Sequence, residues 1–180
     1  MTASGTGATP PQRTEVETML GRFVLAATAE GLCSLVPLGA GARPAAAAAQ
    51  AAEEPQHLCQ AVQALRAYCA GDPTPYGGAL DLAGTEFQLR VWRRLLAVPY
   101  GAQVTYGALA TDLGLPGEAR AVGTAVAANP IAILIPCHRV VGAGGTLRGY
   151  AWGLDLKRRL LARELRLGSV FQPADERGRT

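Results

Sequence analysis

The sequence is poor in the residues that build metal sites and disulfide networks. It has four cysteines and two histidines in 180 residues, and no two cysteines form a Cys-x-x-Cys pair. These residues do not make a four-ligand zinc set at a known spacing, so we predict no metal site. Disulfide frameworks are rare in cytosolic chains, so reduced thiols are expected at Cys33, Cys59, Cys69 and Cys137.

Long apolar runs are also missing. No stretch approaches the roughly 20 apolar residues that span a bilayer, and the N-terminus "MTASGTGATPPQR" lacks the basic-then-apolar pattern of a signal peptide. We therefore expect a cytoplasmic protein that does not insert into membranes. An apolar content of 49% is enough for one ordinary domain or two small lobes.

Acidic residues are scarce in one half of the chain. Residues 84–168 hold 11 Lys+Arg and 5 Asp+Glu, a net charge of +6, whereas residues 1–83 hold 4 and 7, a net charge of −3. A basic C-terminal half suggests a polyanionic partner, although many basic faces contact only solvent. Charge alone therefore leaves the partner open.

The N-terminal part predicts a small α/β lobe over residues 18–80. Residues 1–17 are expected to be a flexible tail, and the Ala-rich segment 44–54 reads as either a helix or a mobile loop. The stretch "RFVLAATAEGLCSLVPLG" predicts two apolar strands joined at "AEG". The stretch "PQHLCQAVQALRAYCAG" predicts a helix whose buried face holds Leu58, Val62, Leu65 and Cys69.

Three helices are predicted between residues 85 and 130. Thr85 and Gln88 fit a capping box before the first, whose apolar face comprises Phe87, Val91, Trp92, Leu95 and Leu96. Thr105 is expected to cap the second helix, and the third lies within "GEARAVGTAVAANP". Two helices joined by a tight Gly-containing turn form a helix-turn-helix outline. An ordinary helical hairpin fits the pattern equally well.

The third helix has two distinct faces. Spacing predicts an inward face of Ala119, Val122, Gly123 and Val126. The outward face carries one long cation and otherwise small side chains: Arg120, Thr124, Ala127 and Ala128. Small side chains allow a helix to lie close against a groove.

A thiol and an imidazole follow the apolar run "IAILI", which is expected to be a buried extended segment. Cys137 and His138 are adjacent in "IPCHRVV". A final helix, "LDLKRRLLARELRLG", has a predicted buried face with Glu164 near its centre, among Leu156, Leu160, Leu161 and Leu165. A carboxylate there must be paired or hydrogen-bonded, either with Lys157 or with a histidine that it orients.

A free thiol has a pKa of about 8.5 and is mostly protonated at pH 7, so Cys137 needs a base in order to react. Neighbouring side chains usually diverge, so a bridging water would carry the thiol proton to His138, and Glu164 would hold the imidazolium. The residues alone do not decide between this nucleophile and a structural buried cysteine.

The stretch "IPCHRVV" resembles the active-site signature of the 6-O-methylguanine-DNA methyltransferases. Similar segments follow the order of that family: "GTEFQLRVW", "VPYGAQVTYGALA", "ARAVGTAVAANP", "RGYAWGL", which is closest to the bacterial branch, and "LLARE". The resemblance covers about residues 84–168. It implies an α/β protein whose mainly helical C-terminal lobe, of winged helix-turn-helix type, is the catalytic domain. Residues 169–180 would form a flexible tail.

The resemblance implies a repair protein that transfers the methyl group of 6-O-methylguanine to its own Cys137 once, without a cofactor. His138 and Glu164 would form the water-linked relay. Asn129 would hold the hinge before the active-site segment with its amide. Tyr106 would crowd the DNA phosphate and protonate the leaving guanine at N3.

The resemblance also implies how an expected monomer binds double-stranded DNA. The third helix would enter the minor groove, where the small Thr124, Ala127 and Ala128 suit a close approach, and Arg120 would fill the space of the flipped base. The pocket would be walled by Tyr106, Val126, Pro136, Val140, Tyr150, Ala151 and Trp152, with the Val140 backbone reading the base edge and the Ala151 amide near O6. We hypothesise that Trp152 restricts bulky alkyl groups.

Three other functions remain as alternatives. A sensor of alkylated DNA would bind the lesion but would lack the acceptor cysteine. A plain helix-turn-helix regulator would not need the set of Cys137, His138 and Glu164, and a cysteine hydrolase would turn over. Larger relatives fuse regulatory domains to this core, but this chain is too short for them, so no transcriptional role is expected.

Overall fold

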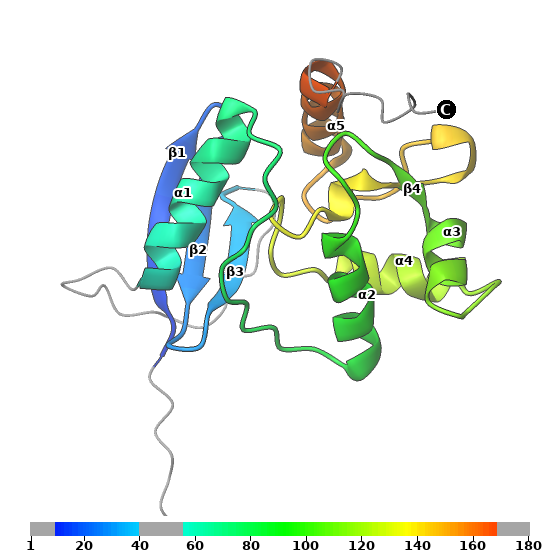
Figure 1. Cartoon of the computed structure of the whole chain (residues 1–180), viewed down its shortest axis with the longest axis horizontal. Coiled ribbons are helices and arrows are strands. Elements are labelled where there is room, and N and C mark those ends of the chain that lie inside the picture. The colour runs from blue at the N-terminus through cyan, green and yellow to red at the C-terminus, as the bar shows by residue number, and fades with distance from the viewer. Residues whose placement is uncertain (1–9, 40–55, 169–180) are drawn as a thin grey trace, which may run out of the picture.

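The computed structural model describes residues 10–39 and 56–168. The expectations for segment 44–54, for residues 1–9 of the tail and for residues 169–180 lie outside these ranges. Within them the predicted α/β class is confirmed: a three-stranded antiparallel sheet with one helix is joined to a mainly helical part (Figure 1). No helix in the described ranges is long and apolar enough to cross a membrane.

The sheet consists of β1 (Gln12–Thr18), β2 (Gly21–Ala27) and β3 (Leu32–Pro37), in that order. The predicted hairpin of β2 and β3 is confirmed. The expectation of a loose tail through residue 17 is wrong, because β1 pairs with β2 along its whole length. Val16 is the one fully buried residue of "QRTEVET", so the strand carries little of the alternation that would reveal it.

The helix α1 (Gln56–Ala70) covers one face of this sheet (Figure 1). Leu58, Leu65 and Cys69 are buried as predicted, and Val62 packs against the core with partial exposure. Tyr68 is also buried, near the C-terminal end of α1. This end of the helix approaches the functional site described below.

The helix α2 (Glu86–Leu96) begins with the predicted capping box. Thr85 Oγ1 accepts a hydrogen bond from the Gln88 amide at 3.2 Å, and Gln88 Oε1 accepts one from the Thr85 amide at 2.9 Å. Trp92 is buried and donates its indole N–H to the carbonyl oxygen of Ala125 at 2.8 Å. This bond fixes α2 against α4 (Ala119–Ala127).

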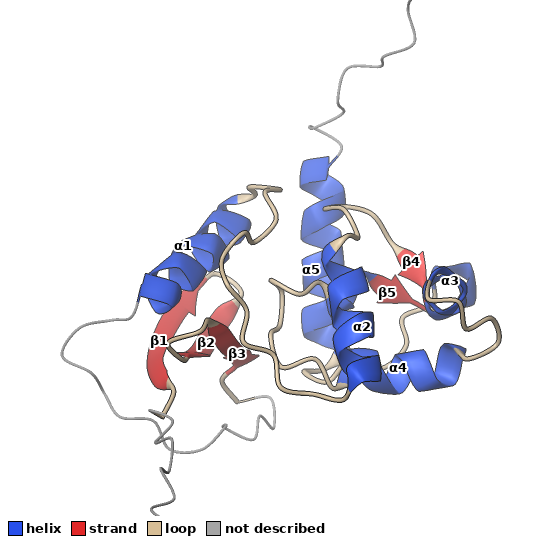
Figure 2. Cartoon of the chain, turned by 60° about the horizontal axis from the view of Figure 1, so that its bottom comes forward, coloured by secondary structure: helices blue, strands red, loops and turns tan. Residues whose placement is uncertain are grey.

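The predicted helix-turn-helix outline consists of α3 (Tyr106–Asp112) and α4, which pack together (Figure 2). Thr105 caps α3 as predicted, accepting from the Ala108 amide at 3.1 Å. The connection turns at Gly114 and Gly117, whose φ angles of 76° and 94° are strained for other residues. The short β4 (Val104–Thr105) precedes α3 and pairs in parallel with β5 (Val140–Val141).

The last helix is α5 (Leu154–Gly168). In both views it lies between the sheet with α1 on one side and the helices α2, α3 and α4 on the other (Figures 1 and 2). Arg159 donates to the carbonyl oxygen of Met19, and Arg163 donates to that of Cys69. Leu160 and Leu161 are buried as predicted, but Leu165 is 54% exposed, which corrects that expectation. The buried residues of α5 are Lys157, Leu160, Leu161 and Glu164, so the buried face extends toward Lys157 and leaves Leu165 outside it.

The sheet also contacts the chain just before the "IPCHRVV" stretch. Leu35 of β3 donates its amide to the carbonyl oxygen of Pro130 at 3.0 Å, and Ala132 donates to the Leu35 carbonyl oxygen at 2.7 Å. The N-terminal sheet thereby fixes the segment that leads to Cys137. The proposed division into separate domains at residues 80–84 stays a prediction.

Candidate active site

Asn129 organises a tight turn that delivers Cys137. Its Nδ2 atom lies 3.0 Å from three acceptors, the carbonyl oxygens of Ile131 and Ile135 and the sulfur of Cys137. Its Oδ1 accepts from the Ile131 amide at 3.0 Å. "IAILI" is buried as expected but is not extended, because the chain reverses at Ile133 with φ 67°. A positive φ is rare for a β-branched residue, and the Asn129 contacts offset its cost.

The Cys137 thiol is buried, with a relative exposure of 2%. Burial raises its pKa to about 11, although the Asn129 amide, the Tyr150 hydroxyl and the charge of Lys157 act in the opposite direction. Ionising such a thiol at pH 7 costs about 5 kcal/mol. A reaction at Cys137 therefore requires a nearby base that takes the proton.

His138, the next residue in the chain, is fully buried and is held by Glu164. Its Nε2 atom lies 2.7 Å from Glu164 Oε1. Burial lowers the pKa of His138 despite the contrary effect of Glu164, so the ring is neutral at pH 7. Because the carboxylate accepts a hydrogen bond, the Nε2 atom carries the ring hydrogen, and Nδ1 carries the free lone pair. That Nδ1 atom is buried and has no hydrogen-bond partner among the described residues.

Glu164 is the centre of a buried polar cluster. Arg139 donates to both carboxylate oxygens, at 2.9 and 3.0 Å, Tyr68 donates its hydroxyl at 2.8 Å, and Gly101 donates its amide at 3.0 Å. Burial alone would raise the pKa of Glu164, but its hydrogen bonds and charge interactions with His138 and Arg139 lower it to about 2. The carboxylate is thus ionised and fully satisfied.

The alternative of a Glu164–Lys157 ion pair is wrong. Lys157, the single lysine of the chain, is buried and donates from Nζ to the carbonyl oxygen of Arg148 at 2.9 Å. The same atom lies 5.9 Å from the ring centres of both Tyr106 and Tyr150. Burial lowers the pKa of Lys157, and the Cys137 group acts in the opposite direction. The positive charge of Lys157 therefore acts on the Cys137 thiol and not on Glu164.

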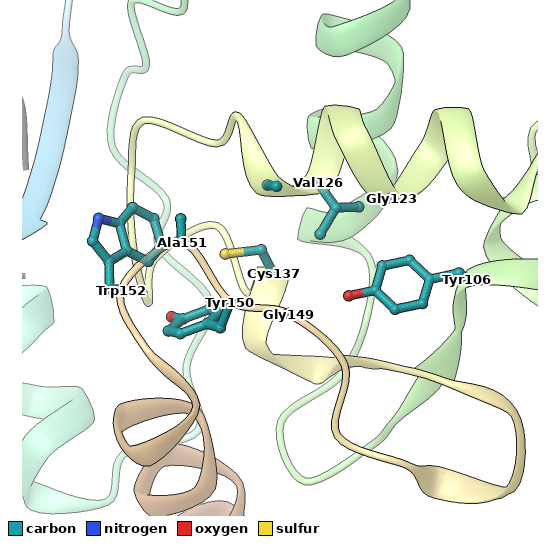
Figure 3. Close-up of a pocket in the computed structure, with 9 residues that line it drawn as sticks. Tyr106, Gly123, Val126, Cys137, Gly149, Tyr150, Ala151 and Trp152 are labelled. Carbon is teal, nitrogen blue, oxygen red and sulfur yellow. The ribbon is translucent and has the colours of Figure 1, made fainter. Parts of the chain in front are cut away.

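A cavity of about 300 Å³ opens onto Cys137. Tyr106 points its hydroxyl into it from one side, and Tyr150, Ala151 and Trp152 lie on the other (Figure 3). Val126, Ala127, Gly123 and Gly149 complete the lining. The Tyr150 and Trp152 rings meet edge to face, with centres 5.2 Å apart. The pocket is thus mostly apolar, with the thiol and two hydroxyls as its polar groups.

Two residues predicted for this pocket do not line it. Pro136 lines a separate cavity on the side of Tyr68 and Tyr100. Val140 is fully buried in β5, where it pairs with Val104. Pro136 and Val140 flank the short 3-10 helix Cys137–Arg139, and of this stretch only Cys137 lines the cavity. The predicted outward face of α4 is exposed at Arg120, Thr124, Ala127 and Ala128.

Arg139 and Tyr68 were not predicted as site residues, and Lys157 was predicted only as a possible partner of Glu164. Arg139 adjoins the two recognised residues, and the rule that a buried carboxylate needs a cation would have favoured it. Tyr68 lies 96 positions from Glu164, and no local pattern links them. No group of three or more His, Cys, Asp or Glu in the described ranges is arranged to hold a metal ion.

Known proteins resemble this chain in both sequence and structure. Residues 86–166 match the family model described as 6-O-methylguanine DNA methyltransferase, DNA binding domain. The methylated-DNA–protein-cysteine methyltransferase of Mycolicibacterium paratuberculosis is 54% identical over 114 residues, which cover 63% of this chain and 69% of the relative. The protein of that name from Methanosarcina acetivorans is 43% identical over 148 residues, covering 82% and 94%.

The similarity includes the N-terminal sheet. The crystal structure of Mycobacterium tuberculosis OGT in complex with DNA superposes with a TM-score of 0.79 and 41% identity, covering 87% of this chain and 94% of that chain. The matched region is therefore larger than the helical part alone.

Replacing Glu164 with Gln should destabilise the fold most strongly at neutral pH. The folded-state pKa of about 2 lies below the ordinary value of 4.5, so ionised Glu164 stabilises the fold above pH 4.5. This contribution is lost as the pH falls from 4.5 through about 2. At pH 7 we expect a loss of about 3–5 kcal/mol, because Arg139 is left buried without its partner. Urea unfolding between pH 7 and pH 2.5 measures it.

The matched control is Asp155→Asn, which removes the same charge from an exposed pair with Arg158 on the same helix. It should have a much smaller effect at every pH. Equal losses in the two variants, or a Glu164→Gln deficit that does not shrink toward low pH, would contradict the assigned role of the carboxylate.

Proposed function

The chain belongs to the 6-O-methylguanine-DNA methyltransferase family, and we propose that it repairs DNA by moving the alkyl group of 6-O-methylguanine irreversibly to Cys137. Its relatives are named methylated-DNA–protein-cysteine methyltransferase, and a similar structure is bound to DNA. The observation that carries the assignment of Cys137 is its buried thiol at the cavity, followed in the chain by a buried histidine whose Nδ1 atom has no partner among the described residues and can accept a proton.

The proton of Cys137 passes through a bridging water to Nδ1 of His138. Glu164 stabilises the imidazolium that forms, because the carboxylate is already ionised and lies 2.7 Å from Nε2. Arg139 and Tyr68 keep the carboxylate oriented. The negative thiolate and the positive imidazolium form together, so the net charge of the site does not change in this step.

The thiolate sulfur then attacks the alkyl carbon. A carbon–sulfur bond forms as the carbon–O6 bond breaks, and the electron pair of the broken bond stays with guanine. Tyr106, whose hydroxyl points into the cavity, donates a proton to N3 of the leaving base (Figure 3). The imidazolium of His138 then releases its proton to water and the Tyr106 phenolate takes one up, so both groups return to their neutral forms. The product at Cys137 is a thioether, which the relay cannot hydrolyse. Each molecule therefore reacts once, and the step needs no cofactor.

DNA approaches along the exposed face of α4. A base inside a duplex cannot reach a buried thiol, so it must be flipped out, at a cost of a few kcal/mol. Arg120 occupies the vacated space, while Thr124, Ala127 and Ala128 allow α4 to lie close in the minor groove. Contacts there carry little sequence information, which suits a protein that scans all sequences. The cytoplasmic location and the monomeric state expected from the sequence stay predictions.

Mixing the protein with an oligonucleotide duplex that carries one 6-O-methylguanine should add one methyl group to each molecule. Intact-protein mass spectrometry measures the gain, and peptide mapping assigns it to Cys137. Cys137→Ala should show no gain, whereas Cys59→Ala, a control thiol in α1, should gain the methyl normally. Binding of the lesion without a mass change would favour the sensor, and repeated turnover would favour a hydrolase.

Replacing Trp152 with Ala should widen the range of alkyl groups. Trp152 is 9% exposed and forms one side of the cavity against Tyr150, so its removal opens space for a ring. We expect reaction with 6-O-benzylguanine to accelerate by about tenfold or more relative to 6-O-methylguanine, the discrimination that a pocket wall can supply. Single-turnover rates with both substrates measure the ratio. An unchanged ratio would show that Trp152 does not set the size limit.

A further inference from the structure

A second, wider groove adjoins the Cys137 cavity. It encloses about 880 Å³ and shares Tyr106, Gly123 and Ala127 with the smaller cavity. A nucleotide whose base occupies the smaller cavity must connect to the duplex past these shared residues. Its sugar and flanking phosphates would then lie in the groove.

Two cations from different elements line this groove. Arg120 belongs to α4, and Arg148 belongs to the loop between the short 3-10 helix Ala143–Gly145 and α5. No Asp or Glu of the described ranges is among the lining residues. Neither arginine forms an ion pair with a described carboxylate, and both are exposed. The groove therefore suits an anion, and the mechanism above uses only Arg120.

The backbone and stem of Arg148 are held in place by the active site itself. Its carbonyl oxygen accepts the Nζ proton of buried Lys157 at 2.9 Å. Its side-chain stem lies over Gly142, where an added Cβ would fall 2.8 Å from Arg148 Cγ and 2.4 Å from Thr146 Oγ1. Glycine at 142 thus leaves room for the stem to lie along the backbone. Lys157 in turn contacts the rings of Tyr106 and Tyr150, so Arg148 is anchored to the wall of the cavity.

We propose that Arg148 binds a phosphate of the strand that carries the flipped nucleotide. The inference rests on the proposed function and adds a contact from an element other than α4. A guanidinium can bind a phosphate through two parallel hydrogen bonds. A phosphate contact carries no base information, so Arg148 contributes affinity without sequence preference. It holds the strand after flipping, whereas Arg120 fills the gap inside the duplex.

The test measures DNA binding without transfer, in a Cys137→Ala background. The dissociation constant of a duplex with one 6-O-methylguanine is measured between 0.05 and 0.2 M salt for Arg148→Ala, Arg148→Lys and Arg93→Ala. Loss of one phosphate contact should reduce the slope of log K against log salt by about 0.9, so that the loss of affinity is about 3.5-fold larger at 0.05 M than at 0.2 M salt. Arg148→Lys should retain most of the slope. Arg93→Ala, an exposed charge on α2 outside the groove, should leave it unchanged.

An undamaged duplex separates a flipped-strand contact from general attraction. Arg148→Ala should weaken its binding less than that of the damaged duplex, because no nucleotide is extruded. The assignment would be overturned if Arg148→Ala had the same salt slope as Arg93→Ala, or if Arg148→Ala lost equal affinity for the damaged and the undamaged duplex. Failure of the proposed function would instead appear as a parent protein, with Cys137 present, that gains no methyl group.

Discussion

The site depends on one buried carboxylate. Glu164 is 1% exposed, and it is ionised because His138, Arg139, Tyr68 and the Gly101 amide surround it with donors. A buried charge with fewer partners would cost several kcal/mol and would take up a proton instead. These partners come from α1, from the loop after α2 and from the segment after Cys137, while Glu164 itself belongs to α5. The same cluster that sets the state of His138 therefore also connects the sheet side of the molecule to the helical side.

Two features next to this cluster explain why a reactive thiol can follow the most apolar run of the chain. The turn at Ile133, held by Asn129, directs Cys137 into the cavity while "IAILI" stays buried. The thiol itself is neutral at rest, since burial raises its pKa to about 11. A neutral thiol fits an apolar environment, and the proposed relay supplies the charge only when the alkyl group is in place. The thiol is thus neutral while the site is at rest and becomes a reactive thiolate only during the transfer, so burial and reactivity are compatible.

Local patterns predicted much of the architecture. The capping box at Thr85, the N-cap at Thr105 and the apolar faces of α1 and α2 depend on neighbours three or four residues apart, so the sequence displays them directly. The strand β1 has a single fully buried residue and pairs mostly through its backbone, so its side chains gave no signal. The resemblance located Cys137, His138 and Glu164, and the pairing of the last two is present in the structure. Contacts that join distant segments, such as Tyr68 to Glu164 or Lys157 to Arg148, depend on the assembled fold, and no spacing rule gives them.

The central claim is that neutral His138 takes the thiol proton, and the pH dependence of a single turnover tests it most directly. The thiolate–imidazolium pair holds the same number of protons as the neutral pair. Its population is therefore independent of pH between the lowered pKa of His138 and the pKa of about 11 at Cys137. We predict a transfer rate that does not change from about pH 7 to 9 and that falls only below the ordinary histidine pKa of 6.5. In His138→Gln this pH-independent region should be abolished. A rate that rises about tenfold per pH unit from pH 7 to 9 would show that hydroxide in solution ionises Cys137 without the relay, and would contradict the account.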